Sequence, residues 1–75
     1  MTKFIVVELQ TNASGAVANL VYSYDEQAAA ESKYYLILSS AAISQIPKHA
    51  AVLMTSEGYL IESRCFDRTQ GEGEE

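Results

Sequence analysis

The sequence offers few side chains that could carry proton transfer or nucleophilic chemistry. His49, the only histidine, belongs to the residue type that changes charge near neutral pH, but at the start of a strand a structural hydrogen bond explains it better. Cys65 is the only cysteine, and no base or helix N-terminus near it in sequence would activate its thiol. We therefore expect a hydrogen-bonded histidine, a small buried cysteine and no catalytic residue.

Two carboxylates and a set of tyrosines are the other candidates. Glu8 and Glu62 fall within strand-like segments, where each could point inward, stay solvated or pair with a basic residue. Clustered tyrosines can form a binding surface, although core and dimer packing explains most of them. The chain has five tyrosines: Tyr22, Tyr24, Tyr34, Tyr35 and Tyr59. If a ligand binds between subunits, the candidate contacts are Glu8, His49 and Tyr59.

Sequence motifs of enzymes and metal sites are absent. The chain has no H-x-x-x-H, C-x-x-C or G-x-S-x-G pattern, and the turn at residues 12–15 has a single glycine without the spacing of a phosphate-binding loop. One histidine and one cysteine do not make a zinc site of the usual kind. We predict no enzyme activity, no metal and no cofactor.

Composition argues against two classes of partner and indicates a compartment. The formal net charge is −5 and the five basic residues are scattered, so no positive stripe could follow a phosphate backbone. No segment approaches the roughly 20 apolar residues that span a bilayer. The lone cysteine indicates a reducing compartment, and the N-terminus lacks the apolar run of a signal peptide. We expect a cytoplasmic protein that binds neither nucleic acid nor membrane.

The residue pattern predicts two β-hairpins in a single domain of residues 1–66. The predicted strands cover residues 2–10, 17–24, 49–55 and 59–66, which are rich in β-branched, aromatic or alternating apolar residues. A polar cluster turns the first hairpin, and Gly58, which can adopt positive φ, turns the second. The acidic segment 67–75 has nothing to bury, so we expect a disordered tail.

A helix is predicted between the hairpins. Asp25 is the expected N-cap, because its carboxylate can accept from the free N–H groups of the alanine-rich run that follows. Pro47 ends the helix, because the residue before a proline disfavours helical geometry. At about 100° per residue, one apolar stripe forms the predicted core face. The stripe contains Ala30, Tyr34, Ile37, Leu38 and Ala41.

These elements give an α+β fold of the order ββαββ. A right-handed crossover through the helix that steps over the first strand produces a four-stranded antiparallel sheet of order 2-1-3-4 with the helix on one face. The first and third strands are then central, which fits their apolar residues on both sides.

One helix covers one face of such a sheet, so the other face would lie open in a monomer. A 75-residue chain without disulfides or metal needs another source of stability, and we expect a homodimer. Pairing could use the open sheet face or the outer side of the helix. The candidate interaction residues are Phe4, Val6, Val52 and Met54 on the sheet, and Tyr35 and Leu36 on the helix.

Several strings of the sequence are specific enough to compare with a family. They are FIVVELQTN at residues 4–12, YD at 24–25, AESKY at 30–34, HAAVLM at 49–54 and GYL at 58–60. In these strings the chain resembles a group of short uncharacterised proteins from low-GC Gram-positive bacteria, many of them carried in prophages or other mobile elements. The resemblance implies a small cytosolic protein and implies no activity.

The expected function follows from surplus apolar surface without catalytic groups. We expect a non-enzymatic interaction or regulatory module that works as a homodimer and binds an unidentified protein partner. A small-ligand binder with a pocket at the dimer interface is the alternative.

Overall fold

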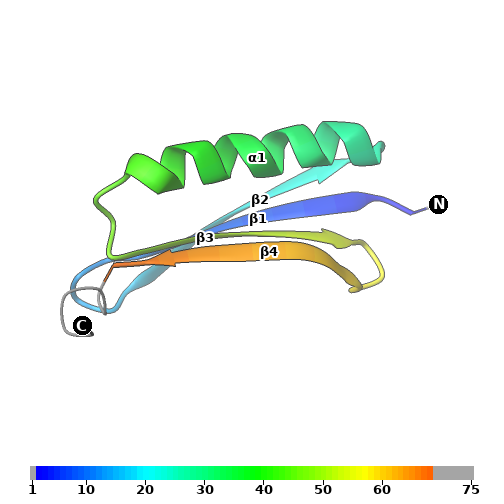
Figure 1. Cartoon of the computed structure of the whole chain (residues 1–75). Coiled ribbons are helices and arrows are strands. Elements are labelled where there is room, and N and C mark those ends of the chain that lie inside the picture. The colour runs from blue at the N-terminus through cyan, green and yellow to red at the C-terminus, as the bar shows by residue number, and fades with distance from the viewer. Residues whose placement is uncertain (1, 69–75) are drawn as a thin grey trace.

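The computed structural model describes residues 2–68, which form four strands and one helix (Figure 1). In chain order the elements are β1 (Phe4–Thr11), β2 (Val17–Tyr24), α1 (Gln27–Ile43), β3 (Lys48–Thr55) and β4 (Leu60–Asp67). The sheet order is β2-β1-β3-β4, and every neighbouring pair of strands is antiparallel. The predicted α+β fold with order 2-1-3-4 is confirmed.

The β1–β2 hairpin turns on Asn12. Its side-chain oxygen accepts hydrogen bonds from the Ser14 N–H at 3.0 Å, the Ser14 hydroxyl at 2.7 Å and the Ala16 N–H at 3.0 Å. A short polar side chain that satisfies nearby backbone groups in this way stabilises a turn. The polar cluster of the sequence therefore forms the expected loop.

The β3–β4 hairpin turns on Gly58, which has a φ of +96°. Its N–H donates to the Thr55 carbonyl at 2.9 Å, and the Thr55 N–H donates to the Tyr59 carbonyl at 2.9 Å. The strand pairing then shifts register between Leu53 and Met54, which is a β-bulge in β4. The turn predicted at Gly58 is therefore present, and the bulge is a feature that the residue pattern did not indicate.

The start of α1 differs from the prediction. The N-cap is Glu26 rather than Asp25, and no side chain bonds to the first free N–H groups of the helix. The Asp25 carboxylate forms an ion pair with Lys3 instead. The expected cap was wrong because the side chain of Lys3, the residue before β1, comes within reach of the same carboxylate.

The core lies between α1 and the two central strands. Its buried cluster consists of Val6, Ala30, Tyr34, Ile37, Ala51 and Leu53. Leu38 packs against this cluster from its margin, and Ala41 is also buried. The predicted apolar stripe of the helix is therefore confirmed as the core face. Within residues 2–68, no helix is long and apolar enough to cross a membrane.

The end of β4 is bonded to the end of α1. The guanidinium of Arg68 donates to the carbonyl oxygens of Ala41 at 2.6 Å and Ala42 at 3.0 Å, and the Arg68 N–H donates to the Pro47 carbonyl at 2.7 Å. The last carbonyls of a helix lack partners within the helix and carry partial negative charge. An arginine therefore stabilises them both by hydrogen bonds and by its positive charge. The domain therefore continues past the predicted boundary at residue 66, and residues 69–75 of the predicted tail lie outside the described residues.

Candidate functional site

Glu8 of β1 and His49 of β3 meet beneath α1. The Nε2 atom of His49 lies 2.6 Å from Oε2 of Glu8. His49 is 3% exposed, and the side chain of Glu8 is 13% exposed. The residue pattern made both residues possible ligand contacts between subunits. The structure brings them together within one chain, on the helix-covered side of the sheet.

Two more polar side chains extend this pair. Nε2 of Gln10 donates to Glu8 at 3.0 Å, and Oγ of Ser44 lies 3.2 Å from Nδ1 of His49. The Ser44 hydroxyl also accepts the Ile46 N–H at 3.1 Å. The Nε2–H of the imidazole donates to the Glu8 carboxylate in either charge state, and Nδ1 pairs with the Ser44 hydroxyl. We call Glu8, Gln10, Ser44 and His49 the polar network.

The polar network controls the charge of Glu8. Burial by itself would raise the pKa of this carboxyl, because the charged form loses hydration. The hydrogen bonds from His49 and Gln10, together with the electrostatic effect of His49 and Lys33, outweigh burial and hold the pKa below its ordinary value of 4.5. Glu8 is therefore a carboxylate at neutral pH, and its negative charge is balanced by hydrogen bonds from His49 and Gln10 and by the charge of Lys33 on the helix.

Ser44, His49 and Glu8 follow the order hydroxyl, imidazole, carboxylate, which is also the order of an acyl-transfer triad. A nucleophile needs space for a substrate and donors for an oxyanion. His49 is buried, and the Ser44 hydroxyl accepts a backbone N–H in the segment that leads from α1 to β3. The geometry supports a structural role, in which the polar network connects the end of α1 to the centre of the sheet.

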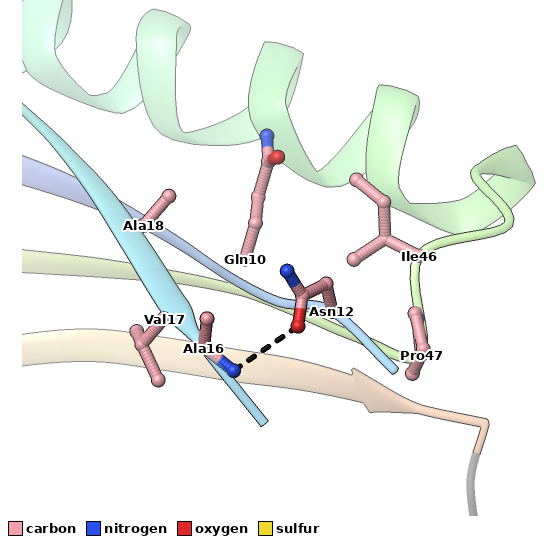
Figure 2. Close-up of a pocket in the computed structure, with 7 residues that line it drawn as sticks. All are labelled: Gln10, Asn12, Ala16, Val17, Ala18, Ile46 and Pro47. Atoms are coloured by element: carbon pink, nitrogen blue, oxygen red, sulfur yellow. Dashed lines mark hydrogen bonds between the residues drawn. The ribbon is translucent and has the colours of Figure 1, made fainter. Parts of the chain in front are cut away.

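A cavity of ≈ 240 Å³ opens beside the polar network (Figure 2). The side chain of Gln10 stands between β2 and the helix, and Ile46 faces it from the segment after α1. The lining residues are Gln10, Asn12, Ala16, Val17, Ala18, Ile46 and Pro47. None of these lining residues is charged, and neither His49 nor Ser44 is among them. The cavity therefore suits a small uncharged molecule that can hydrogen-bond to an amide.

Two sequence candidates lie away from the polar network. Tyr59 is 71% exposed in the β3–β4 turn and bonds to Thr55 at the end of β3, whereas His49 is near the start of that strand. Cys65 is exposed rather than buried, because it lies on the helix-free side of the edge strand β4. The structure therefore does not bring Tyr59 together with Glu8 and His49, and the expected burial of Cys65 was wrong.

The helix-free face of the sheet is the larger candidate site. The helix α1 lies along one side of the sheet (Figure 1). The strand residues that alternate with the core residues belong to the other side, which we call the helix-free face. The apolar members of this face are Ile5, Val7, Leu9, Val17, Val21, Ala50, Val52, Met54, Leu60 and Cys65. Lys48 and Asp67, opposite each other in the register, are the charged members of the face within residues 2–68. The centre of the face is therefore apolar on both inner strands.

The structure corrects the predicted interaction surface at β1. Phe4 packs against the core and Val6 is completely buried in it, so both belong to the helix-covered side. Val52 and Met54 lie on the helix-free face, as the alternation in the third strand predicted. The assignment failed in β1 because apolar residues at four successive positions fit either side of a strand, and only contact with α1 distinguishes them.

The outer side of α1 is the other exposed apolar surface. Tyr35 is 52% exposed and Leu36 is 59% exposed. Ile43, which was not among the predicted interaction residues, is 85% exposed. The Tyr35 hydroxyl donates to Glu62 of β4 at 3.2 Å, and the negative charge of Glu62 raises the pKa of Tyr35. Tyr35 is therefore anchored at the margin of the helix, while Leu36 and Ile43 project into solvent.

Comparison with protein-family models, with curated proteins and with solved structures found no match. The resemblance to short proteins of Gram-positive bacteria and their mobile elements stays a prediction.

Proposed function

We propose that the protein is a non-enzymatic interaction module that works as a homodimer, with the helix-free faces of two copies packed together. One observation carries this proposal: more charged residues lie on the side of the sheet that the helix covers than on the side that the helix leaves open. The helix-covered side carries Glu8, Glu62 and Arg64, whereas the helix-free face has charge at its Lys48–Asp67 end. A sheet face that stays in water normally carries polar residues, whereas the inner strands of this face are apolar from Ile5 to Leu9 and from Ala50 to Met54.

Packing two such faces together would add the buried apolar surface that a short chain lacks. A chain of this length buries only about 60% of the surface that it exposes when unfolded, which leaves a single domain marginally stable. Each Å² of apolar surface removed from water contributes about 25 cal/mol. Two sheets pack face to face at about 10 Å, with their inner side chains interdigitating. Val52 and Val7, which are partners at the middle of the two central strands, would lie at the centre of that interface.

The face-paired dimer leaves the outer side of each α1 in solvent. Leu36 and Tyr35 would then be the surface offered to a protein partner, since tyrosine and leucine give contact area at moderate entropic cost. A regulatory role in which one dimer holds two partner molecules follows from the two-fold symmetry. The prophage or mobile-element context belongs to this proposal as well.

The proposal is tested by the mass of the protein in solution, measured by light scattering. Val52→Lys puts a charge at the centre of the helix-free face, and we expect it to abolish face pairing. Leu36→Lys is the matched control, because it makes the same change at an exposed apolar residue on the outer side of the helix. Circular dichroism checks that both variants keep the fold.

Three outcomes are informative. Loss of mass in Val52→Lys, with Leu36→Lys unchanged, supports face pairing. The reverse result would move the dimer to the helix. A wild-type protein that stays at the chain mass of 8.2 kDa at every concentration would overturn the proposed homodimer.

A second candidate function is the binding of a small uncharged ligand, favoured by the cavity beside Gln10. This cavity is on the helix-covered side, so a ligand there would not sit between the helix-free faces. Gln10→Ala removes one of the two amide side chains that line the cavity, the other being that of Asn12. A panel of small amides and alcohols should raise the melting temperature of the wild type but not of Gln10→Ala, and an unchanged wild-type melting temperature would count against ligand binding.

A further inference from the structure

We infer that the free edge of β2 pairs with β2 of a second copy, as an antiparallel continuation of the sheet. This contact goes beyond the proposed function, because it uses the backbone at one edge rather than the side chains of the helix-free face. The occupant is a second copy of this chain, and the reasons come from the composition, regularity and backbone phase of β2.

β2 lacks the features that protect a sheet edge. Its sequence, Val-Ala-Asn-Leu-Val-Tyr-Ser-Tyr, has no charged residue and no proline. Its pairing with β1 runs from Val17 to Tyr24 without a register shift. Val17 is 58% exposed, Leu20 is 50% exposed and Val21 is 61% exposed. A long, regular and apolar edge of this kind is a template for pairing with another strand.

The opposite edge is protected in two ways. β4 has a bulge next to Leu60, which twists the edge and interrupts regular pairing. It also carries Glu62, Arg64 and Asp67 along its length. The sheet therefore has one edge that resists pairing with another strand, β4, and one that does not, β2. We place the pairing surface on β2 for this reason.

The hydrogen-bond phase shows which backbone groups of β2 face outward. The Asn12 N–H donates to the Ala16 carbonyl at 3.0 Å, so Asn12 and Ala16 are a hydrogen-bonded pair of the β1–β2 ladder. In an antiparallel ladder every second pair is hydrogen-bonded, so the next such pair is Gln10 with Ala18, and the even-numbered residues of β2 bond to β1. The Ser56 N–H donates to the Lys3 carbonyl at 2.9 Å, so the backbone groups of the odd-numbered residues of β1 point toward β3. This agrees with the even-numbered residues of β1 bonding to β2. The outward-facing residues of β2 are therefore Val17, Asn19, Val21 and Ser23.

This phase selects one symmetric register. When the two-fold axis passes through Leu20, Asn19 faces Val21 of the second copy and Val17 faces Ser23, so every outward-facing residue finds a partner. Leu20 then lies against Leu20 of the second copy, in a pair without hydrogen bonds where side chains approach most closely. The register places no charged residue of β2 against its equivalent, because β2 has none.

The two contacts can be separated by mutation because they use different sides of the chain. Leu20 lies on the helix-covered side, in register with Glu8, so a change there leaves the helix-free face intact. Leu20→Lys places two ammonium groups against each other at the two-fold axis. Leu20→Thr is the control, because threonine keeps the strand preference without a charge.

The masses of the variants in solution are the first measurement. When the face contact and the edge contact form together, a particle holds at least four chains, and we expect this mass for the wild type and for Leu20→Thr. Loss of one contact should leave two chains in Leu20→Lys and in Val52→Lys, and the double variant should be a monomer. A mass of Leu20→Lys equal to that of the wild type would overturn the edge contact. A loss of mass in Leu20→Lys with none in Val52→Lys would keep the edge contact and remove the face contact.

Amide hydrogen exchange measured by NMR is the second readout, since it reports the backbone directly. The N–H groups of Ala18, Leu20 and Tyr22 bond to β1 and should be protected at all concentrations. Those of Asn19, Val21 and Ser23 should slow by more than about tenfold when the wild type is concentrated, and should stay fast in Leu20→Lys. Fast exchange at these outward positions in the concentrated wild type would contradict the inference, whatever the mass.

Discussion

The Nε2 atom of His49 lies 2.6 Å from Oε2 of Glu8, and the two residues are diagonal neighbours on the central strands, since His49 is the register partner of Gln10 and Glu8 is the partner of Ala51. A slip of one residue between β1 and β3 would turn one of the two side chains to the other face. The buried pair therefore specifies the register of two central strands whose apolar residues on both faces would tolerate alternatives.

The first prediction is that Glu8→Gln destabilises the protein in a pH-dependent way. The folded protein holds the pKa of Glu8 below 4.5, so the stability contributed by its carboxylate is complete above that pH and is lost as the pH falls through the lower folded value. We expect Glu8→Gln to lower the free energy of unfolding by about 1–2 kcal/mol at neutral pH. Urea unfolding across the acid range should show this difference shrinking below pH 4.5.

A variant outside the polar network provides the control. Glu57→Gln changes an exposed carboxyl in the β3–β4 turn, and it should leave the acid limb of the stability curve as in the wild type. A Glu8→Gln difference that stays constant from neutral to acid pH would show that the carboxylate is not the source of the effect.

The second prediction concerns the end of α1. Arg68→Ala removes the donors to the carbonyls of Ala41 and Ala42, and we expect a loss of about 1–2 kcal/mol, because hydrogen bonds to charged donors are stronger than neutral ones. Arg68→Lys keeps the positive charge near the helix C-terminus and should recover part of this loss. Urea unfolding at one fixed protein concentration measures both, and equal stability of Arg68→Ala and the wild type would refute the capping role.

The third prediction uses Cys65 as a probe of the helix-free face. The thiol is exposed in the single chain, so a thiol reagent should label it quickly in dilute protein. Face pairing covers the thiol, and labelling should slow by at least about tenfold as the protein concentration rises well above the dissociation constant. In Val52→Lys, labelling should stay fast at all concentrations.

A cysteine elsewhere shows whether this slowing is specific to the face. Ser39 is exposed on the outer side of α1, so Ser39→Cys in a Cys65→Ser background should be labelled at one rate regardless of concentration. Slowing at both positions would indicate general aggregation instead of a defined interface.

The fourth prediction tests the β3–β4 turn. Gly58 has a φ of +96° and no atom within 4 Å of an added Cβ, so the cost of Gly58→Ala is a matter of backbone conformation alone. We expect a destabilisation of about 1 kcal/mol, with a smaller loss in Gly58→Asn, since asparagine tolerates positive φ better than alanine. A thermal melt at fixed concentration measures the difference. An unchanged melting temperature in Gly58→Ala would show that the turn relaxes to another conformation.

Local pattern in the sequence was enough for the elements and their order. The apolar stripe around Tyr34 and Ile37 determined which side of the helix is buried, because side chains three and four residues apart share a face of a helix. Gly58 located the second turn, because few other residues adopt its φ. The handedness of the crossover then left the order 2-1-3-4 for the sheet.

The tertiary structure decided which groups meet. No local pattern predicted that Glu8 would bond to His49. Glu8 and Gln10 do share the side of β1 that carries Val6, and two polar residues beside a core residue indicate a buried polar partner. Arg68 was assigned to a tail because its partners, the carbonyls of α1, are distant in sequence.

The side of β1 that faces α1 shows the same division. Neighbouring residues of a strand point to opposite faces, so the sequence alone is enough to place Phe4 and Val6 on one face and Ile5 and Val7 on the other. Which of these faces is covered depends on packing against the helix, and that is a contact between residues far apart in the chain. Sequence periodicity is a local property, whereas burial is decided by the whole fold.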